Sequence, residues 1–242
     1  HIAITGPSGG GKSTLISLMP RFNDPMRGII SIGGHDIKDM RLQDVRGIFG
    51  IAFQDAFLFN ASILDNLRYA RPNAKTEEII NACKLTGAHD VIEQLPARYN
   101  ARIGDQGVEL SHGQKQRINL ARALVRNPQT LIIDEITASI DAKAAKQIIK
   151  TVLEHMSGRT VIIVTHDPSI LALAHRVITL DNKTITDDQY KDGTNMKHPA
   201  AKLSTLFLAL SMFVGCSTTD TTSIITMEDP KSTGIIFEEE DP

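Results

Sequence analysis

A glycine-rich segment between an apolar run and a helical pattern restricts the fold of this 242-residue chain more than any other feature. Residues 6–13 read GPSGGGKS, directly after IAIT at 2–5 and directly before a pattern typical of a helix. The segment matches GxxxxGK[ST], in which glycines let successive backbone N–H groups face an anion at the start of a helix. The match predicts a phosphate-binding loop that joins a buried strand to a helix.

The residue types at the end of this loop have a defined chemistry. Lys12 is expected to reach the β and γ phosphates of a nucleotide, and Ser13 to give its hydroxyl to Mg²⁺. The alternative is an ordinary glycine-rich turn, which the strand before the loop and the helix after it disfavour. The residues predicted to bind the nucleotide here are Gly6, Pro7, Ser8, Gly9, Gly10, Gly11, Lys12, Ser13 and Thr14.

Short apolar runs alternate with helical patterns from His1 to about residue 180. The runs are too continuous for half-exposed strands, and their β-branched residues indicate parallel strands buried on both faces. Strands are predicted at 2–5, 48–53, 131–134 and 161–164, and helices at 12–19, 112–126 and 142–156. The alternation predicts an α/β sandwich with its ligand sites at the carboxyl ends of the strands. About 55–128 holds helices and no convincing strand, which predicts an inserted helical subdomain.

Polar residues with catalytic chemistry follow three of these strands. Asp134 and Glu135 follow LII: Asp134 is expected to hold Mg²⁺, and Glu135 to polarise the water that attacks the γ-phosphate. His166 follows VIIVT and could donate a hydrogen bond to that phosphate or water, while Gln54 could reach metal or water through its amide. For Asp134 and Glu135 the alternative is a solvated strand end, and for His166 it is a surface or core histidine whose hydrogen bonds are satisfied. Gln54 taken singly is weak evidence.

A second anion site is predicted at residues 110–114, which read LSHGQ and precede a helical run. Ser111 is a good N-cap residue, and the N-terminus of a helix carries about half a positive charge. The phosphate loop of the same chain already has its own helix, so this second helix start is available to another phosphate.

These motifs, in this order, resemble the nucleotide-binding domain of ATP-binding cassette (ABC) transporters from His1 to about residue 187. LSHGQ resembles the family's LSGGQ signature, with His112 in place of the first central glycine. The other matching segments are FQDAFLF (53–59), TASID (137–141) and THD (165–167).

The resemblance implies ATP and Mg²⁺ as ligands and ATP hydrolysis that powers export. It implies a second cassette packed head to tail, so that Ser111, Gly113 and Gln114 bind the γ-phosphate held by the partner's phosphate loop, with Asp141 at the same interface. The implied catalytic residues are Glu135, His166 and Gln54, and the implied metal ligands are Ser13, Gln54 and Asp134.

GDQGVELSHGQ and LFNASILDNLRYARPNA (58–74) resemble exporter cassettes, whose helical subdomain receives a membrane domain. The resemblance implies a position at the cytoplasmic face of a bacterial inner membrane. The chain starts at the phosphate-loop strand, so we expect a cassette truncated before its adenine-stacking aromatic residue. Two alternatives stay open: a soluble ABC ATPase without membrane partners, and a truncated remnant that hydrolyses nothing.

Composition excludes several other functions. Lys plus Arg (26) nearly balance Asp plus Glu (28), so bulk charge does not favour nucleic acid as a partner. The two cysteines, Cys83 and Cys216, indicate neither a disulfide framework nor a zinc cluster. No run approaches the roughly 20 apolar residues that a membrane-spanning helix needs.

The last part of the chain differs from the rest. A weakly basic start, an apolar stretch over 203–215 and Cys216 resemble a bacterial lipoprotein signal. The alternative is an amphipathic C-terminal helix. The predicted organisation is an ABC ATPase domain at 1–187, with a P-loop NTPase parallel sheet and a helical subdomain at about 55–128, followed by an unrelated or disordered tail at 188–242.

Overall fold

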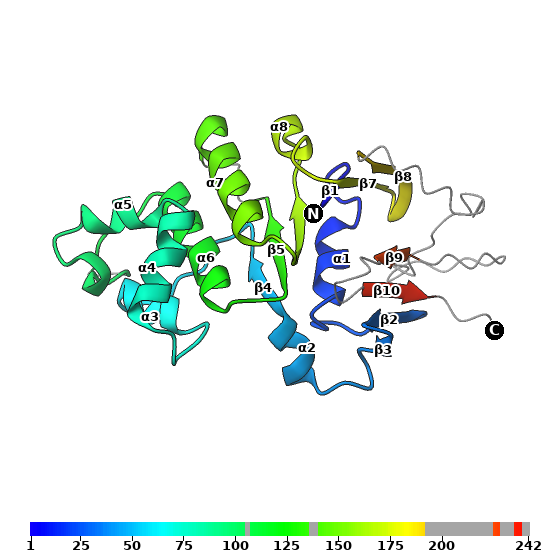
Figure 1. Ribbon diagram of the computed structural model, residues 1–242, viewed down its shortest axis with the longest axis horizontal. Helices are drawn as coiled ribbons and strands as arrows, with labels where there is room; N and C mark the ends of the chain where they lie inside the picture. The colour runs from blue at the N-terminus through cyan, green and yellow to red at the C-terminus, as the bar shows by residue number, and fades with distance from the viewer. Residues whose placement is uncertain (105–106, 136–139, 192–224, 228–234, 239–242) are drawn as a thin grey trace. The chain divides into compact units, whose positions relative to one another are not determined.

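The computed structural model describes residues 1–104, 107–135, 140–191, 225–227 and 235–238 (Figure 1). The chain forms two compact units. The first contains His1–Ile48 together with Ala174–Pro242, and the second contains Phe49–Leu173.

Parallel strands form the core of the first unit. Strand β1 (Ile2–Thr5) pairs in parallel with β7 (Arg176–Asp181), which pairs antiparallel with β8 (Thr184–Tyr190). Ala3 and Ile4 are fully buried, as expected of a strand from a continuous apolar run. Helix α1 (Lys12–Leu18) follows β1 through the glycine-rich loop (Figure 1). The predicted strand–loop–helix order is confirmed.

A second sheet in this unit has the order β3-β2-β10-β9. Strands β2 (Ile29–Ile32) and β3 (His35–Asp36) are joined by Gly33 and Gly34, whose φ angles are +60° and +79°. Positive φ at both central residues is what a two-residue hairpin turn needs, and glycine adopts it without steric cost. Strand β10 (Ile235–Glu238) pairs antiparallel with β2 and with β9 (Ile225–Met227).

The lipoprotein-like stretch and the alternative amphipathic helix lie outside the residues that the structure describes, as do positions 136–139 of the segment around TASID. Among the helices that the structure does describe, none is long and apolar enough to cross a bilayer.

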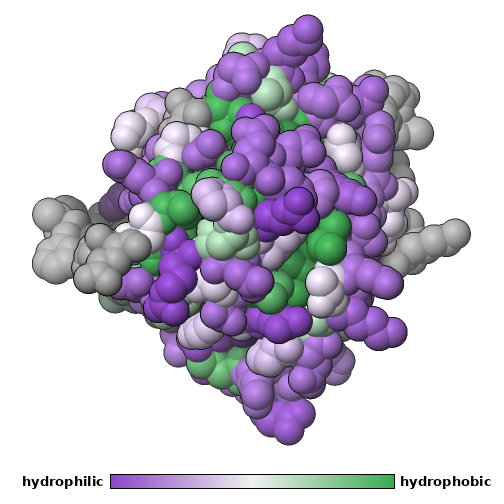
Figure 2. All heavy atoms as spheres, turned by 90° about the vertical axis from the view of Figure 1, so that its left-hand side faces the viewer, coloured by the Kyte–Doolittle hydropathy of each residue, from purple (hydrophilic) through white to green (hydrophobic). Residues whose placement is uncertain are grey.

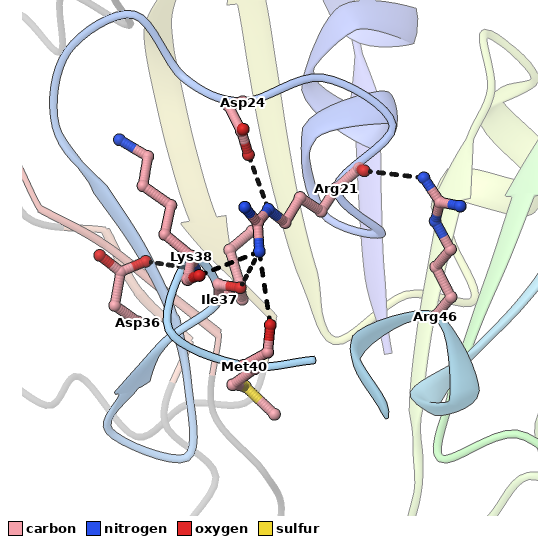
Figure 3. A network of polar contacts seen from close by, with 7 residues as sticks. All are labelled: Arg21, Asp24, Asp36, Ile37, Lys38, Met40 and Arg46. Carbon is pink, nitrogen blue, oxygen red and sulfur yellow. Dashed lines mark hydrogen bonds and ion pairs between the residues drawn. The ribbon is translucent and has the colours of Figure 1, made fainter. Parts of the chain in front are cut away.

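Arg21 binds the segment between β3 and helix α2 (Leu42–Ile48) to the end of α1 (Figure 3). Its guanidinium donates to the carbonyl oxygens of Ile37 (2.9 Å), Lys38 (3.0 Å) and Met40 (3.4 Å), and its Nε donates to Asp24 at 2.7 Å. The backbone oxygen of Arg21 in turn accepts from Arg46 on α2 at 3.2 Å. A short irregular segment gains its hydrogen bonds from one side chain in this way.

Arg21→Met is therefore expected to destabilise the protein by about 2–4 kcal/mol, because three carbonyl oxygens lose a charged donor. Urea unfolding measures the change. Arg41→Met is the matched control, since Arg41 and Asp44 form an ion pair with the same spacing and the same 2.7 Å distance as Arg21 and Asp24. The Arg41 side chain is 86% exposed, against 19% for Arg21, so the control should leave stability unchanged. Equal effects of the two variants would contradict the role given to the carbonyl contacts.

Three parallel strands form the sheet of the second unit, in the order β4-β5-β6. They are β4 (Phe49–Ala52), β5 (Thr130–Asp134) and β6 (Thr160–Val164), and every residue of β5 is buried. Helices α7 (Ala142–His155) and α8 (Pro168–Leu171) follow β5 and β6 along the chain. The predicted strands and helices of this unit are confirmed to within two residues at their ends.

Helices fill the segment between β4 and β5 (Figure 1). They are α3 (Ile63–Arg68), α4 (Thr76–Leu85), α5 (Ala88–Glu93), a 3₁₀ turn (Arg98–Asn100) and α6 (His112–Val125). Ile118 and Leu120 of α6 are fully buried in one core with Ile79 of α4 and Ile92 of α5. Figure 2 faces this helical part and shows hydrophobic groups in small patches between hydrophilic ones.

Parallel strands alternating with helices in both units confirm the predicted α/β class. Two strands end earlier than predicted, which changes where the polar residues after them lie. Strand β4 ends at Ala52 and not at Phe53, so Gln54 lies in an irregular segment two residues after the strand. Strand β6 ends at Val164, which places His166 two residues beyond it.

Candidate functional site

Backbone conformation in the loop at 6–13 depends on glycine. Gly6, Gly9 and Gly11 have φ angles of +136°, +76° and +99°, which other residues rarely adopt. A Cβ atom on Gly6 would lie 1.8 Å from the backbone oxygen of Leu180, so no side chain fits there. The loop is thus curled as a phosphate-binding loop requires.

The turn between β7 and β8 packs on this loop, which sequence reasoning missed. The Lys183 N–H donates to the Gly10 oxygen at 3.1 Å, and Asn182 and Lys183 have positive φ angles of 47° and 66°. No motif indicates such a contact, because it joins the backbone of two residues that lie 173 positions apart in the chain.

Lys12, the first residue of α1, is only 7% exposed. Its Nζ donates to the backbone oxygens of Gly6 (2.8 Å) and Pro7 (2.9 Å), which holds the ammonium group over the loop. Phosphate oxygens are the same kind of acceptor, so a bound nucleotide could exchange for these carbonyl groups. Ser13 and Thr14 lie exposed in the same first helical turn.

Two acidic residues stand where β5 ends. Asp134 is the last residue of the strand and is 6% exposed. Glu135 has a φ of +43°, and its N–H donates to the oxygen of Val164 at 3.0 Å. A non-glycine residue with a positive φ carries a backbone cost of about 1–3 kcal/mol. The strained backbone turns Glu135 out of the line of the strand.

Glu135 and His166 meet at the ends of neighbouring strands. Glu135 Oε1 lies 3.0 Å from His166 Nε2, and the two side chains are 24% and 50% exposed. The next residue, Asp167, caps α8 by accepting from the Ser169 N–H at 2.8 Å. Hydrogen bonds from the side chain and backbone of Ser169 lower the pKa of Asp167. The histidine thus lies in a fixed turn beside the carboxylate.

Helix α6 begins with a reciprocal cap. Ser111 Oγ accepts from the Gln114 N–H at 3.3 Å, and the Ser111 N–H donates to Gln114 Oε1 at 2.9 Å. This capping box fixes the conformation of the LSHGQ segment, including Gly113. Ser111 and His112 are exposed, so this end of the 14-residue helix is open to a ligand from outside the chain.

Gln54 and Asp141, two other predicted site residues, each accept a hydrogen bond from a nearby helix. The Gln54 side chain is exposed, while its backbone oxygen accepts from Gln116 Nε2 at 3.1 Å. Asp141 caps α7, since its Oδ1 accepts from the Ala144 N–H at 2.9 Å. Gln116 was not singled out from the sequence, and the only signal is a polar residue on the apolar face of α6.

Comparisons with known proteins show the family to which this chain belongs. Residues 1–138 match the family model described as ABC transporter. The chain is 41% identical over 186 residues to the protein named "Putative multidrug export ATP-binding/permease protein YgaD" of Bacillus subtilis, covering 77% of this chain and 32% of that protein. It is 40% identical over 186 residues to ABC transporter B family member 14 of Arabidopsis thaliana, covering 77% of this chain and 15% of that protein.

The solved structure of a bacterial Atm1-family ABC exporter with ATP bound is also similar. Its TM-score is 0.74 at 38% identity, and the match covers 78% of this chain and 33% of that one. The chain spans about a third of the length of the bacterial relatives that it matches, and less of the plant relative.

Proposed function

This chain belongs to the ABC transporter family, and on that premise we propose that it binds ATP and hydrolyses it as the nucleotide-binding domain of an exporter. The observation that carries the proposal is the 3.0 Å contact between Glu135 and His166 at the ends of two parallel strands, in a chain that also has a curled phosphate loop. A carboxylate and an imidazole in contact can hold a water molecule and accept its proton.

In this proposal, the phosphate loop binds the triphosphate. Backbone N–H groups of the loop at 6–13, other than Pro7, which has none, would face the phosphate oxygens. Lys12 would give its ammonium to the β and γ phosphates. Ser13, Asp134 and Gln54 would hold Mg²⁺. Their hydroxyl, carboxylate and amide oxygens are the hard donors that this ion prefers. When bound, the ion neutralises negative charge on the phosphates.

Glu135 is proposed as the group that orients and polarises the attacking water. Its side chain is partly exposed, and His166 holds one of its oxygens. His166 is proposed to hold the γ-phosphate or the water through its imidazole. The 3.0 Å contact with His166 holds the carboxylate in this direction before substrate arrives.

A second cassette is proposed to complete the site. The N-terminus of α6 is exposed, so its partial positive charge can serve a phosphate held by another copy. Ser111, Gly113 and Gln114 would contact that γ-phosphate. Asp141 would lie near the same interface.

A membrane domain is proposed as the other partner, which places the protein at the cytoplasmic face of a membrane. Phe57 and Tyr69 are 67% and 69% exposed, and both rings contact Phe59, with centroid distances of 5.2 and 4.5 Å. These aromatic rings lie in and beside the segment 58–74 that resembles exporter cassettes. Exposed aromatic groups are frequent anchors of protein interfaces.

The proposed site between two copies is tested by crosslinking. One copy carries Ser8→Cys, the other carries Ser111→Cys, and both carry Cys216→Ser. Cys83 is buried, and burial raises its pKa to about 12, so this thiol should not react. A short bis-maleimide should give a dimer under saturating ATP, and little dimer with ADP or without nucleotide. Failure to crosslink under saturating ATP would refute the two-copy site.

A further inference from the structure

The hairpin of β7 and β8 ends in a tight turn whose second residue is a lysine. Asp181 pairs with Thr184, so Asn182 and Lys183 form the turn, and both have positive φ angles, 47° and 66°. Positive φ at both positions is the geometry of a type I′ turn, in which glycine is the preferred second residue. Lysine adopts this conformation at a steric cost, so the local sequence alone does not explain the shape of the turn.

The turn leaves one backbone donor for use outside the hairpin. In a β-turn the internal hydrogen bond runs from the N–H of the fourth residue to the carbonyl of the first, and the N–H of the third residue takes no part in it. That third residue is Lys183, and its N–H donates to the Gly10 oxygen of the phosphate loop at 3.1 Å. The hairpin thus donates a hydrogen bond to the loop from a fixed turn.

The strand before the turn also lies against the loop. A Cβ atom on Gly6 would lie 1.8 Å from the Leu180 oxygen, and one on Gly10 would lie 3.1 Å from the same oxygen. Leu180 is 1% exposed, and the pairing of β7 with β8 shifts its register between Thr179 and Leu180. An irregularity of this kind bends and twists a strand locally. The hairpin therefore contacts the loop near its start, at Gly6, and near its end, at Gly10.

The bond to Gly10 fixes the direction of the next amide group. The peptide group that joins Gly10 and Gly11 is planar and trans, so its C=O and its N–H point in opposite directions. Because the Gly10 oxygen points at Lys183, the Gly11 N–H points away from the hairpin. Gly11 is the N-cap residue of α1, and the N–H groups at the start of a helix have no acceptor within it. The hairpin thus orients a donor that the helix itself does not use.

We propose that Lys183 is a positioning residue for the phosphate loop. Its backbone N–H holds the Gly10 carbonyl and thereby directs the Gly11 N–H toward the phosphates before nucleotide binds. The inference rests on the proposed function. It adds that a turn 173 positions along the chain from the loop belongs to the nucleotide site, and that the backbone of this turn contributes to the affinity for ATP.

Replacing the amide between Asn182 and Lys183 by an ester tests this role, because the change removes the N–H and keeps both side chains. The α-hydroxy acid analogue of lysine is incorporated at position 183 of the whole chain. The affinity for Mg-ATP should fall by about three- to tenfold, which is the effect of one lost hydrogen bond. Isothermal titration measures the affinity, and thermal unfolding measures the stability of the same sample.

An ester between Tyr190 and Lys191 is the matched control. The Lys191 N–H donates to the His175 oxygen at 2.8 Å, so this ester also removes a backbone hydrogen bond of a lysine from the hairpin, but at the other end of β8. Both esters should lower the melting temperature, since each removes one bond, and only the ester at 183 should weaken ATP binding. Equal ATP affinities of the two esters overturn the role of Lys183.

A pair of substitutions keeps the inference testable if the ester at 183 does not fold. Lys183→Val places a β-branched residue where φ is positive, which such residues rarely tolerate, whereas Lys183→Gly suits that conformation. Both variants lack the ammonium group, so Lys183→Val should bind ATP at least about threefold more weakly than Lys183→Gly through displacement of the turn alone. Equal affinities contradict the inference and leave the proposed function intact. Absence of ATP binding by the unmodified chain overturns both.

Discussion

Lys12→Ala should lower the affinity for ATP by at least roughly a hundredfold, because two phosphates lose a charge-assisted hydrogen bond. The Lys12 ammonium is buried and already lies over the loop, bound to the carbonyl oxygens of Gly6 and Pro7. Binding exchanges these two carbonyl acceptors for phosphate oxygens, whose negative charge makes the stronger hydrogen bonds with an ammonium group. Isothermal titration with ATP measures the change.

Lys150→Ala is the control for this loss of charge. Lys150 is 60% exposed on α7 and lies 3.9 Å from Glu154, so its removal changes net charge equally without touching the loop. It should bind ATP as the unmodified chain does. Circular dichroism should show that Lys12→Ala is folded, and normal ATP affinity in that folded variant would reject the phosphate-loop assignment.

Glu135→Gln should slow ATP turnover roughly 10²–10³-fold, which is the effect of removing one positioned catalytic group. Glutamine has the same shape but cannot accept a proton. It keeps the strained backbone, the bond to Val164 and an oxygen for His166. Because binding groups are untouched, ATP-dependent dimers should form and persist. Steady-state phosphate release and size-exclusion chromatography measure the two effects.

Glu77→Gln on α4 provides the comparison, since Glu77 is an exposed acid far along the chain from the predicted catalytic residues. Its turnover should be unchanged. Unaltered turnover in Glu135→Gln would refute the catalytic role of Glu135. Loss of the dimers together with turnover would instead indicate that Glu135 contributes to binding.

The buried strands could be predicted because their apolar runs are continuous. IAIT, LIID and VIIV leave no polar face, and such runs fold as β1, β5 and β6. Strand β8 could not be predicted in this way. Its sequence TITDDQY is largely polar and exposed, and it is held by pairing with β7 and by the bidentate contact of Arg176 with Asp188.

The candidate site was predictable where its residues lie in short motifs at the ends of buried strands. The neighbouring positions of Glu135 and His166 follow from parallel strands whose carboxyl ends share an edge. The positive φ of Glu135 and the donors that α6 gives to residues 53–57 were not predictable. Both depend on which backbone packs against which helix, and polar residues such as Asn119 look like ordinary surface positions in the sequence.

Pairing in the small sheet of the first unit has a consequence for association between molecules. Strand β2, with the apolar sequence IISI, has β3 on one side and β10 on the other. Its backbone groups are thus shielded from strands of other molecules. The outermost strands, β3 and β9, are only two and three residues long, and such short borders are poor templates for the growth of an intermolecular sheet.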